Sequence, residues 1–356
     1  MARPFVSVLI DTFNHEPFIE QAILSALQQD FPASDREIVV VDDGSQDRTP
    51  DIAASFAPHV RLIRKANGGQ GSAFNAGIPQ CQGEIVAFLD GDDWWAPAKL
   101  KLVIAAFSVN PQVGLVGHSI TEVLADDASR SELVRESPRF RLDSISGARL
   151  FRRRKSFLGT SRMAFRAELL RRIGPVPEAL TIQADEFLFT LGALFSEVLL
   201  LREALTFYRL HGHNLFQVSD GSRTALQRKH GVLVALTQAL RNRFADERVP
   251  PGVGNAILES LTNESDALAL CLYGGSPLAN VRNELLNFRI TQENASPFRW
   301  LLKCVSLFPA LFLTPKRYAA LKQRLSSISL YRKLRRRVLP AFQPSHVDRT
   351  GHWSPP

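Results

Sequence analysis

GEIVAFLDGDDWW, residues 83–95, is the stretch of the sequence that determines its expected fold. Five consecutive apolar residues, 85–89, predict a strand that is buried on both faces. Three carboxylates follow within four positions, and ligand sites in open α/β sheets lie at the carboxyl ends of strands. Such charges repel one another unless a cation or a set of donors offsets them, so we favour a site for a divalent cation with oxygen ligands. An acidic turn that caps the helix expected near Pro97 would contain the same residue types.

The residues around this stretch alternate between strand-like and helix-like segments. Apolar runs predict strands at residues 6–10, 37–41, 60–63 and 85–89, and helices are expected at 20–29, 50–56, 72–78 and 98–107. This order is typical of a parallel sheet with covering helices, in which the loops after successive strands gather on one rim. Residues 126–157 turn polar and charged and predict a surface connection.

Composition limits the class of protein. With 356 residues, of which 45% are hydrophobic, the chain can form a large core and more than one unit, which excludes wholesale disorder. The three cysteines, Cys81, Cys271 and Cys304, are too scattered for a disulfide framework or a metal-binding spacing, and they suggest a cytoplasmic protein. No apolar run reaches the roughly 18 residues that a membrane-spanning helix needs.

The end of the chain differs from the rest in charge. From Arg299 onward there are twelve Lys or Arg and one acid, so this part carries +11 and the remainder, in a total of +8, carries −3. Residues 300–313 are strongly apolar but too short to span a membrane, which suggests an interfacial segment on anionic lipid. A helix packed on the rest of the protein, with a solvated basic face, is the alternative. We expect a catalytic domain at residues 1–222, a helical region at 223–342 and a disordered tail at 343–356.

Two further polar segments lie where strands are expected to end. DDGSQD, residues 42–47, offers a carboxylate that can accept the N–H of a pyrimidine base, although an Asp-Gly turn before a helix would look the same. NGGQGS, residues 67–72, precedes a helix, so its backbone N–H groups are candidates to face a phosphate or sugar.

These segments together resemble a known family. VSVLIDTFN at 6–14, VDDGS at 41–45, the stretch 67–77 and LDGDD at 89–93 occur in the order and at the spacing of family 2 glycosyltransferases, over roughly residues 4–215. The resemblance implies a GT-A fold, which is a Rossmann-like, mostly parallel α/β sheet with covering helices. It also implies transfer of a sugar, with inversion, from a nucleotide donor in the presence of Mg²⁺ or Mn²⁺. A UDP-linked donor is expected from its frequency in the family.

The resemblance assigns roles to individual residues. It places the donor base against Asp11, Phe13 and Asp43, with the stretch from Asn67 to Gly71 beside the donor. Asp92 and Asp93 resemble the ribose and metal carboxylates, with Asp90 supporting them. His211 resembles a histidine that closes on the metal and diphosphate. Asp185 is similar to the catalytic base, although without the resemblance it would be taken for a helix cap, and its neighbour Glu186 is an alternative base.

The resemblance also limits the reaction. No Gln-x-x-Arg-Trp stretch, which processive members carry, occurs in the chain, so we expect single additions to a hydroxyl of a glycan or lipid-linked acceptor. A sugar-phosphate nucleotidyltransferase is one alternative, and a non-catalytic partner in a polysaccharide assembly complex is another. Nucleic acid is not an expected partner, because the acidic rim repels phosphates and the basic end lacks interleaved stacking residues. The expected location is the cytoplasm, with the basic end against an anionic membrane surface.

Overall fold

A computed structural model describes residues 5–124, 128–134, 137–211, 222–292 and 295–327 of the protein. The described residues fall into two compact units, the first ending at residue 211 and the second beginning at residue 222. The sequence-based limits of 1–222 and 223–342 stay predictions, and the predicted disordered tail at 343–356 lies outside the described residues.

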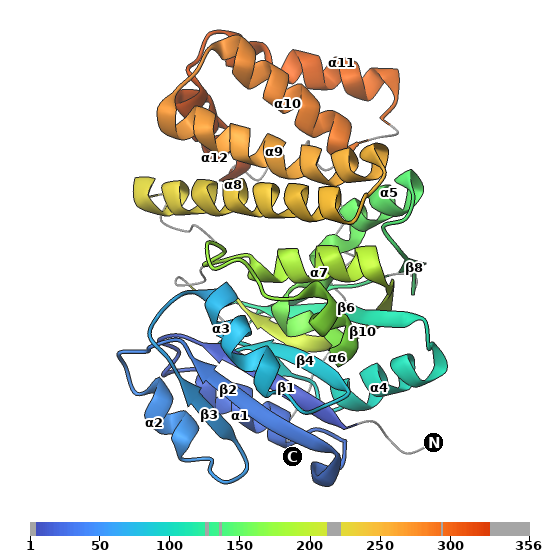
Figure 1. The fold of residues 1–356 in the computed structure, drawn as a ribbon. Coiled ribbons are helices and arrows are strands. Elements are labelled where there is room, and N and C mark those ends of the chain that lie inside the picture. The colour runs from blue at the N-terminus through green and yellow to red at the C-terminus, as the bar shows by residue number, and fades with distance from the viewer. Residues whose placement is uncertain (1–4, 125–127, 135–136, 212–221, 293–294, 328–356) are drawn as a thin grey trace. The chain divides into compact units, whose positions relative to one another are not determined.

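The first unit is built on one mixed sheet with helices on both faces (Figure 1). Its ten strands, among the described residues, are β1 (Val6–Thr12), β2 (Arg36–Asp42), β3 (Arg61–Arg64), β4 (Ile85–Asp90), β5 (Trp94–Trp95), β6 (Val113–Val123), β7 (Ser129–Glu132), β8 (Arg139–Phe140), β9 (Ala164–Arg166) and β10 (Glu197–Arg209). The sheet follows the order β3-β2-β1-β4-β9-β6-β10-β5, and β7 and β8 pair with β6 and β10. The α/β class predicted from the alternating pattern is therefore confirmed.

The parallel half of the sheet explains why polar residues meet at one rim. β3, β2, β1 and β4 are parallel neighbours, as expected, whereas β9 lies antiparallel between β4 and β6. The register of β1 on β4 places Asp11 beside Asp90, and that of β1 on β2 places Thr12 beside Asp42. The residues that follow these strands consequently start from the same edge of the sheet.

Alternate residues of the central strands face two different layers of helices. Val8 of β1 and Ala87 of β4 belong to the core formed with α1 (Ile19–Leu27) and α4 (Lys99–Val109). On the other face, Phe88 contacts Phe74 of α3 (Gln70–Gly77) and Phe165 of β9, each ring meeting it edge to face. Both faces are covered, which is why these strands are apolar throughout.

The remaining helices of the first unit lie in its second half. They are α2 (Thr49–Ala54), α5 (Ile145–Arg154), α6 (Ala167–Ile173) and α7 (Ala184–Phe195). Residues 126–157, expected as a surface connection, instead contain β7, β8 and α5 within their described part. The reason is that Phe140, Ala148 and Phe151 are buried and supply an apolar anchor that the many charged neighbours concealed.

The second unit is helical, as predicted. Its helices are α8 (Arg223–Asp246), α9 (Pro251–Tyr273), α10 (Pro277–Thr291), α11 (Pro297–Ser306) and α12 (Pro315–Ser327), with a short 3₁₀ turn, η5 (Phe308–Leu311). α10 and α11 begin at Ser-Pro pairs, in which the serine hydroxyl caps the helix and proline takes the first helical position. The chain leaves α11 after Ser306 and Pro309 lies in η5, because proline cannot continue the hydrogen-bond ladder.

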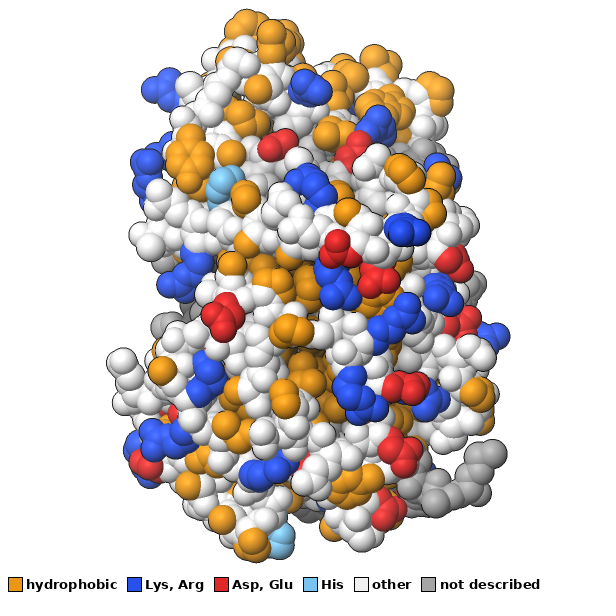
Figure 2. All heavy atoms as spheres, viewed as in Figure 1, with side chains coloured by type: hydrophobic (Ala, Val, Ile, Leu, Met, Phe, Trp, Pro, Cys, Tyr) orange, Lys and Arg blue, Asp and Glu red, His pale blue; other side chains and the backbone are white. Residues whose placement is uncertain are grey.

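Nine of the thirteen large hydrophobic residues that are exposed in the described part of the chain lie in the second unit. Hydrophobic side chains gather over α10 and α11 in Figure 2. Within the described ranges, no helix is both long enough and apolar enough to cross a membrane.

Candidate active site

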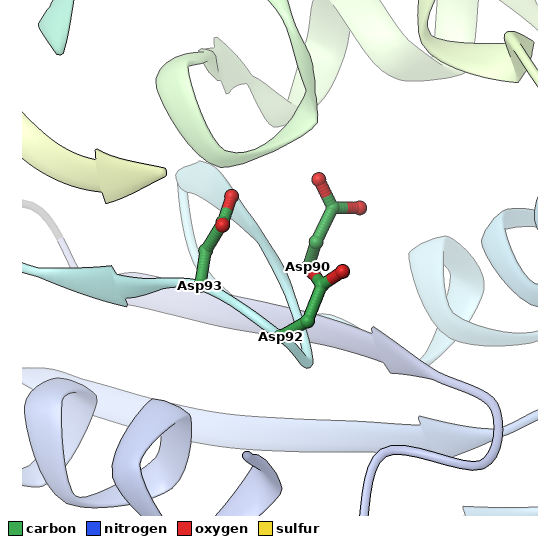
Figure 3. Close-up of side chains that lie close together, drawn as sticks. All are labelled: Asp90, Asp92 and Asp93. Carbon is green, nitrogen blue, oxygen red and sulfur yellow. The ribbon is translucent and has the colours of Figure 1, made fainter. Parts of the chain in front are cut away.

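A carboxylate cluster, which we define as Asp11, Asp90, Asp92 and Asp93, occupies the rim at the ends of β1 and β4. Asp90 ends β4, and the tight turn that follows is closed by a hydrogen bond from Asp93 N to Asp90 O (3.1 Å). Gly91 is required in this turn, because a Cβ there would lie 2.5 Å from Thr12 Oγ1. The side chains of Asp90, Asp92 and Asp93 leave the turn on the same side (Figure 3), with one oxygen of each within 4.8 Å of the others.

The cluster is electrostatically unfavourable without a ligand. Burial, together with the repulsion between neighbouring carboxylates, holds the pKa of Asp11, Asp90 and Asp93 well above their usual range. Two carboxylate oxygens, Asp11 Oδ1 and Asp93 Oδ2, are buried without a hydrogen-bond partner in the part of the chain that is described. Unpartnered buried oxygens in an all-oxygen donor set fit a divalent hard cation such as Mg²⁺ or Mn²⁺.

Two histidines flank Asp92. His211 Nε2 lies 3.0 Å and His15 Nε2 lies 3.8 Å from Asp92 Oδ2. Burial alone would raise the pKa of Asp92, but the hydrogen bond with His211 and the nearby His15 hold it below its usual value. The structure therefore brings His211 to the acids, and its role at a metal stays a prediction from the family resemblance. His15 was not predicted as a site residue, although its position in the loop after β1 was the available signal.

An aromatic stack, which we define as Phe207, Trp94, Arg209, Phe18 and His211, supports that histidine. Trp94 stacks on Phe207, with ring centroids 5.1 Å apart and planes inclined by 11°. The Arg209 guanidinium lies between the rings of Trp94 (4.5 Å) and Phe18 (4.7 Å), and Phe18 contacts His211 at 4.7 Å. Such cation–π contacts favour a fixed arginine position.

Arg209 also binds the acidic turn directly. Its backbone N–H donates to Asp93 Oδ1 (2.9 Å) and its Nε donates to Asp92 O (3.0 Å). The last residue of β10 thus holds two members of the carboxylate cluster in place. Sequence reasoning missed this residue, because nothing near it along the chain indicates that β10 ends against β5.

A buried lysine lies behind the cluster. Lys99 is fully buried, donates to Ser161 O (2.6 Å) and lies 3.7 Å from the ring centroid of Trp95. Ser161 in turn donates from its hydroxyl to Asp90 Oδ2 (3.2 Å). Burial lowers the pKa of Lys99, and the charges of Asp93 and Asp90 oppose that shift. Lys99, like His15 and Arg209, was not predicted as a site residue.

Asp185 lies in the first turn of α7, next to Glu186. Its Oδ1 accepts a hydrogen bond from Glu186 N (2.9 Å), but α7 begins at Ala184 and its N-cap position is Gln183, so Asp185 is not the cap residue of the alternative interpretation. Burial and the charge of Glu186 raise the pKa of Asp185 to about 6, and Asp185 in turn raises the pKa of Asp11 and Asp90. Glu186 is buried and forms an ion pair with Lys155. Of the two adjacent acids, Asp185 is the one that acts electrostatically on the cluster.

The predicted donor-base residues lie at the ends of β1 and β2. Phe13 is half-buried just beyond β1, and Asn67 is exposed. Asp43, just beyond β2, accepts hydrogen bonds from Lys65 Nζ (2.6 Å), Gly68 N (3.1 Å) and Gly69 N (2.7 Å). Its carboxylate therefore already orders the loop that follows β3.

The backbone N–H groups of the glycine-rich segment at residues 67–72 were expected to face a phosphate or sugar, but four of them bind other parts of the protein. Gln70 N donates to Thr181 O and Gly71 N donates to Leu180 O, each at 3.0 Å, and the amides of Gly68 and Gly69 bind Asp43. These four N–H groups are satisfied within the protein rather than turned to a phosphate. A Cβ on Gly71 would lie 2.9 Å from Leu180 O, so the glycine permits close packing of α3 on this second loop.

Comparison with known proteins defines the class. The sequence profile described as "Glycosyl transferase family 2" matches residues 7–174. An uncharacterized glycosyltransferase of Nostoc sp. is 33% identical over 244 residues, which cover 67% of this chain and 75% of that protein. The chain therefore belongs to glycosyltransferase family 2, as the sequence motifs suggested. It is a glycosyltransferase that takes its sugar from a nucleotide-sugar donor.

Solved structures of similar shape confirm the fold. S. aureus TarS in complex with UDP-GlcNAc has a TM-score of 0.53 at 18% identity, covering 80% of this chain and 86% of that one. The mannosyltransferase PcManGT from Pyrobaculum calidifontis, in complex with GDP-Man and Mn²⁺, has a TM-score of 0.54 at 20% identity, covering 94% and 84%. The predicted GT-A fold is thus confirmed.

Proposed function

We propose that the protein transfers one sugar at a time, with inversion, from a UDP-linked donor to a hydroxyl of a glycan or lipid-linked acceptor. The observation that carries this proposal is the carboxylate cluster with its two unpartnered buried oxygens, in a site that also holds Asp185. Four acids at one rim, with an unfavourable charge when no ligand is present, have no evident role in stability.

Asp92 and Asp93, with His211, are the residues that we propose to hold Mg²⁺ or Mn²⁺. His211 Nε2 and Asp92 Oδ2 are 3.0 Å apart, so both can turn to one ion with little movement. A bound divalent cation would supply a Lewis acid that offsets the charge on the leaving nucleoside diphosphate. Asp90 would support these two acids at the donor, because one of its oxygens lies within 4.8 Å of theirs.

Asp185 is the proposed general base. Its pKa of about 6 leaves the carboxyl group ionised at neutral pH, yet basic enough to accept the proton of an attacking hydroxyl. Glu186, the alternative base, is already occupied by Lys155. Attack from the side opposite the leaving diphosphate would give inversion.

The donor nucleotide is proposed from the family and from the residues at the β1 and β2 ends. Phe13 offers a ring for a base, with Asp11 and Asp43 as its proposed neighbours, and Asn67 and Gly71 belong to the segment proposed to lie beside the donor. TarS binds UDP-GlcNAc and PcManGT binds GDP-Man, so structural similarity supports either base, and the preference for UDP comes from family frequency. The basic end of the chain supports a further proposal, a peripheral position on an anionic membrane surface.

A calorimetric titration of nucleoside diphosphates, with and without Mn²⁺, tests the proposal. We expect UDP to bind more tightly than GDP, and Mn²⁺ to increase its affinity, because the metal neutralises the cluster. If UDP bound equally well with and without Mn²⁺, the proposed role of the metal in donor binding would be wrong. Binding without any hydrolysis or transfer of a nucleotide sugar would favour a non-catalytic partner, and formation of a nucleotide sugar from a sugar phosphate would favour a nucleotidyltransferase.

A further inference from the structure

An exposed apolar row runs along α11 and η5 in the second unit. We define it as Phe298, Leu301, Val305, Phe308, Leu311 and Phe312, which are 42–72% exposed. These six are nearly half of the thirteen large hydrophobic residues exposed in the described part of the chain, although they occupy only residues 298–312. Five of them follow one another at spacings of three or four residues, and Phe308 and Phe312 are in ring contact at 5.1 Å. Single exposed hydrophobic residues are ordinary, but a continuous row indicates an interaction surface.

The row is exposed because α11 is held by its opposite side. Trp300 meets Phe288 of α10 edge to face at 4.8 Å, and Lys303 Nζ forms an ion pair with Glu284 Oε2 at 2.7 Å. Beyond the helix, Leu307 and Ala310 are buried in a small core with Tyr318. These contacts fix the orientation of α11 and η5, so the row is a formed surface of this unit.

The segment that carries the row contains charges of one sign. Residues 295–327 contain six Lys or Arg and no Asp or Glu, and Lys316 and Arg317 are exposed directly after η5. The sequence beyond the described residues continues this bias, with five Lys or Arg at 332–337. Two of the six cations, Lys303 and Lys322, form ion pairs with Glu284 of α10, whereas Lys316 and Arg317 give the end of the row a cationic border. Apolar side chains with such a border match a surface that is apolar below and anionic above.

We propose that the apolar row is a membrane-docking surface, which inserts into the interface of an anionic phospholipid bilayer while Lys316 and Arg317 contact the headgroups. Docking of two copies through the same row is less favourable, because it would bring these cations together without any acid from residues 295–327 to compensate them. The proposal does not depend on the transfer reaction, since bilayer binding is measured without donor or acceptor.

Vesicle sedimentation of the full chain tests this surface. We expect binding to vesicles of phosphatidylglycerol and phosphatidylcholine, weaker binding to pure phosphatidylcholine, and a loss of affinity as salt is raised. Leu301→Glu with Val305→Glu places two charges in the middle of the row and should lower vesicle affinity about tenfold or more. Both side chains are at least 60% exposed, so the fold should be kept, which circular dichroism can verify.

Two further variants separate the contribution of the apolar row to vesicle binding from that of the cations beside it. Val234→Glu, at a residue of α8 that is 48% exposed outside the row, is the matched control and should bind vesicles like the wild type. Lys316→Glu with Arg317→Glu should reduce binding to anionic vesicles and leave the weak binding to phosphatidylcholine unchanged.

Several results would overturn the proposal. One is a wild-type chain that does not sediment with anionic vesicles, and another is a Leu301→Glu, Val305→Glu variant that binds as well as the wild type. Equal losses in this variant and in Val234→Glu would also reject a specific surface. Equal binding to neutral and anionic vesicles would reject the role of charge. A wild-type dimer in solution that the double variant dissociates, without any vesicle binding, would assign the row to a second copy of the chain.

Discussion

The carboxylate cluster of the first unit and the apolar row of the second depart from the usual distribution of side chains in opposite directions. The cluster buries acids that would be better solvated in water, and two of its oxygens have no partner among the described residues. The row exposes large hydrophobic side chains that would be better packed in a core. Proteins keep such unfavourable arrangements where a ligand resolves them. On our proposals, each unit is completed by a different kind of partner, a cation with a nucleotide in one case and a lipid surface in the other.

The largest expected effect separates the role of Asp185 in turnover from its role in binding. Asp185→Asn should lower the rate of sugar transfer, or of donor hydrolysis where no acceptor is supplied, by ~10²–10⁴-fold. Nucleotide affinity should change little, because the variant removes the base and keeps the shape of the side chain. Glu186→Gln is the matched control and should retain most turnover. If Glu186→Gln abolishes turnover and Asp185→Asn does not, the base is Glu186.

The pH dependence of kcat/KM is a second test of Asp185 as the general base. Since the pKa of Asp185 is raised to about 6, the base is ionised above that pH, and kcat/KM should fall about tenfold per unit below it. The acidic limb should be absent in Asp185→Asn. The raised pKa also lowers the stability of the folded protein at neutral pH. A carboxyl group whose pKa is higher in the folded state than in the unfolded state destabilises the fold as pH rises from the unfolded-state pKa to the folded-state pKa of about 6. At pH 7 the Asn variant should therefore be more stable, on the order of 1–3 kcal/mol.

A smaller effect is expected from Arg209, which touches the cluster without being proposed to touch the sugar. Arg209→Met should weaken Mn²⁺ activation about 10–100-fold, because the aromatic stack and the bond from Nε to Asp92 O are lost together. Arg209→Lys should recover part of the loss. Activity measured against Mn²⁺ concentration distinguishes this positioning role from a loss of folding, which would lower the maximal rate at all metal concentrations.

The smallest effect should be confined to the second unit. Ser276→Ala removes the hydroxyl that caps α10 and should cost about 1 kcal/mol in the free energy of unfolding, with nucleotide affinity unchanged. Ser144→Ala removes the equivalent cap of α5 in the first unit and serves as the matched control. Calorimetric unfolding and nucleotide titration of both variants would show the effect. A loss of nucleotide affinity in Ser276→Ala would contradict the division of labour between the two regions.

Much of the first unit could be predicted from the sequence, because its parallel strands are nearly continuous apolar runs with polar residues at their ends. That pattern alone placed Asp11, Asp43 and Asp90 at one rim, and the register of β1 on β4 confirms that Asp11 and Asp90 are neighbours. Family resemblance added Asp185 and His211, which the structure brings close to the cluster, while their chemical roles stay predictions.

The missed features all depend on contacts between distant parts of the chain. Arg209 reaches the acidic turn because β10 pairs with β5, and Lys99 reaches Ser161 across 62 positions of sequence. The amides of residues 68–71 looked available because the loop at Leu180 and Thr181, which accepts two of them, cannot be located from local patterns. The break between α11 and η5 has a local cause in Pro309, but the exposure of the apolar row follows from how α10 holds α11.

Because Asp11 lies beside Asp90 in the register of β1 on β4, the lengths of these two strands determine whether the two acids meet at the rim. Removing a single residue from the middle of β1 would send its acid to the opposite side of the pleat and replace it at the rim with an apolar neighbour. Such a change would leave every acid in the sequence and still destroy the place where they meet. Insertions in homologous chains should accordingly accumulate in the loops and spare β1 and β4.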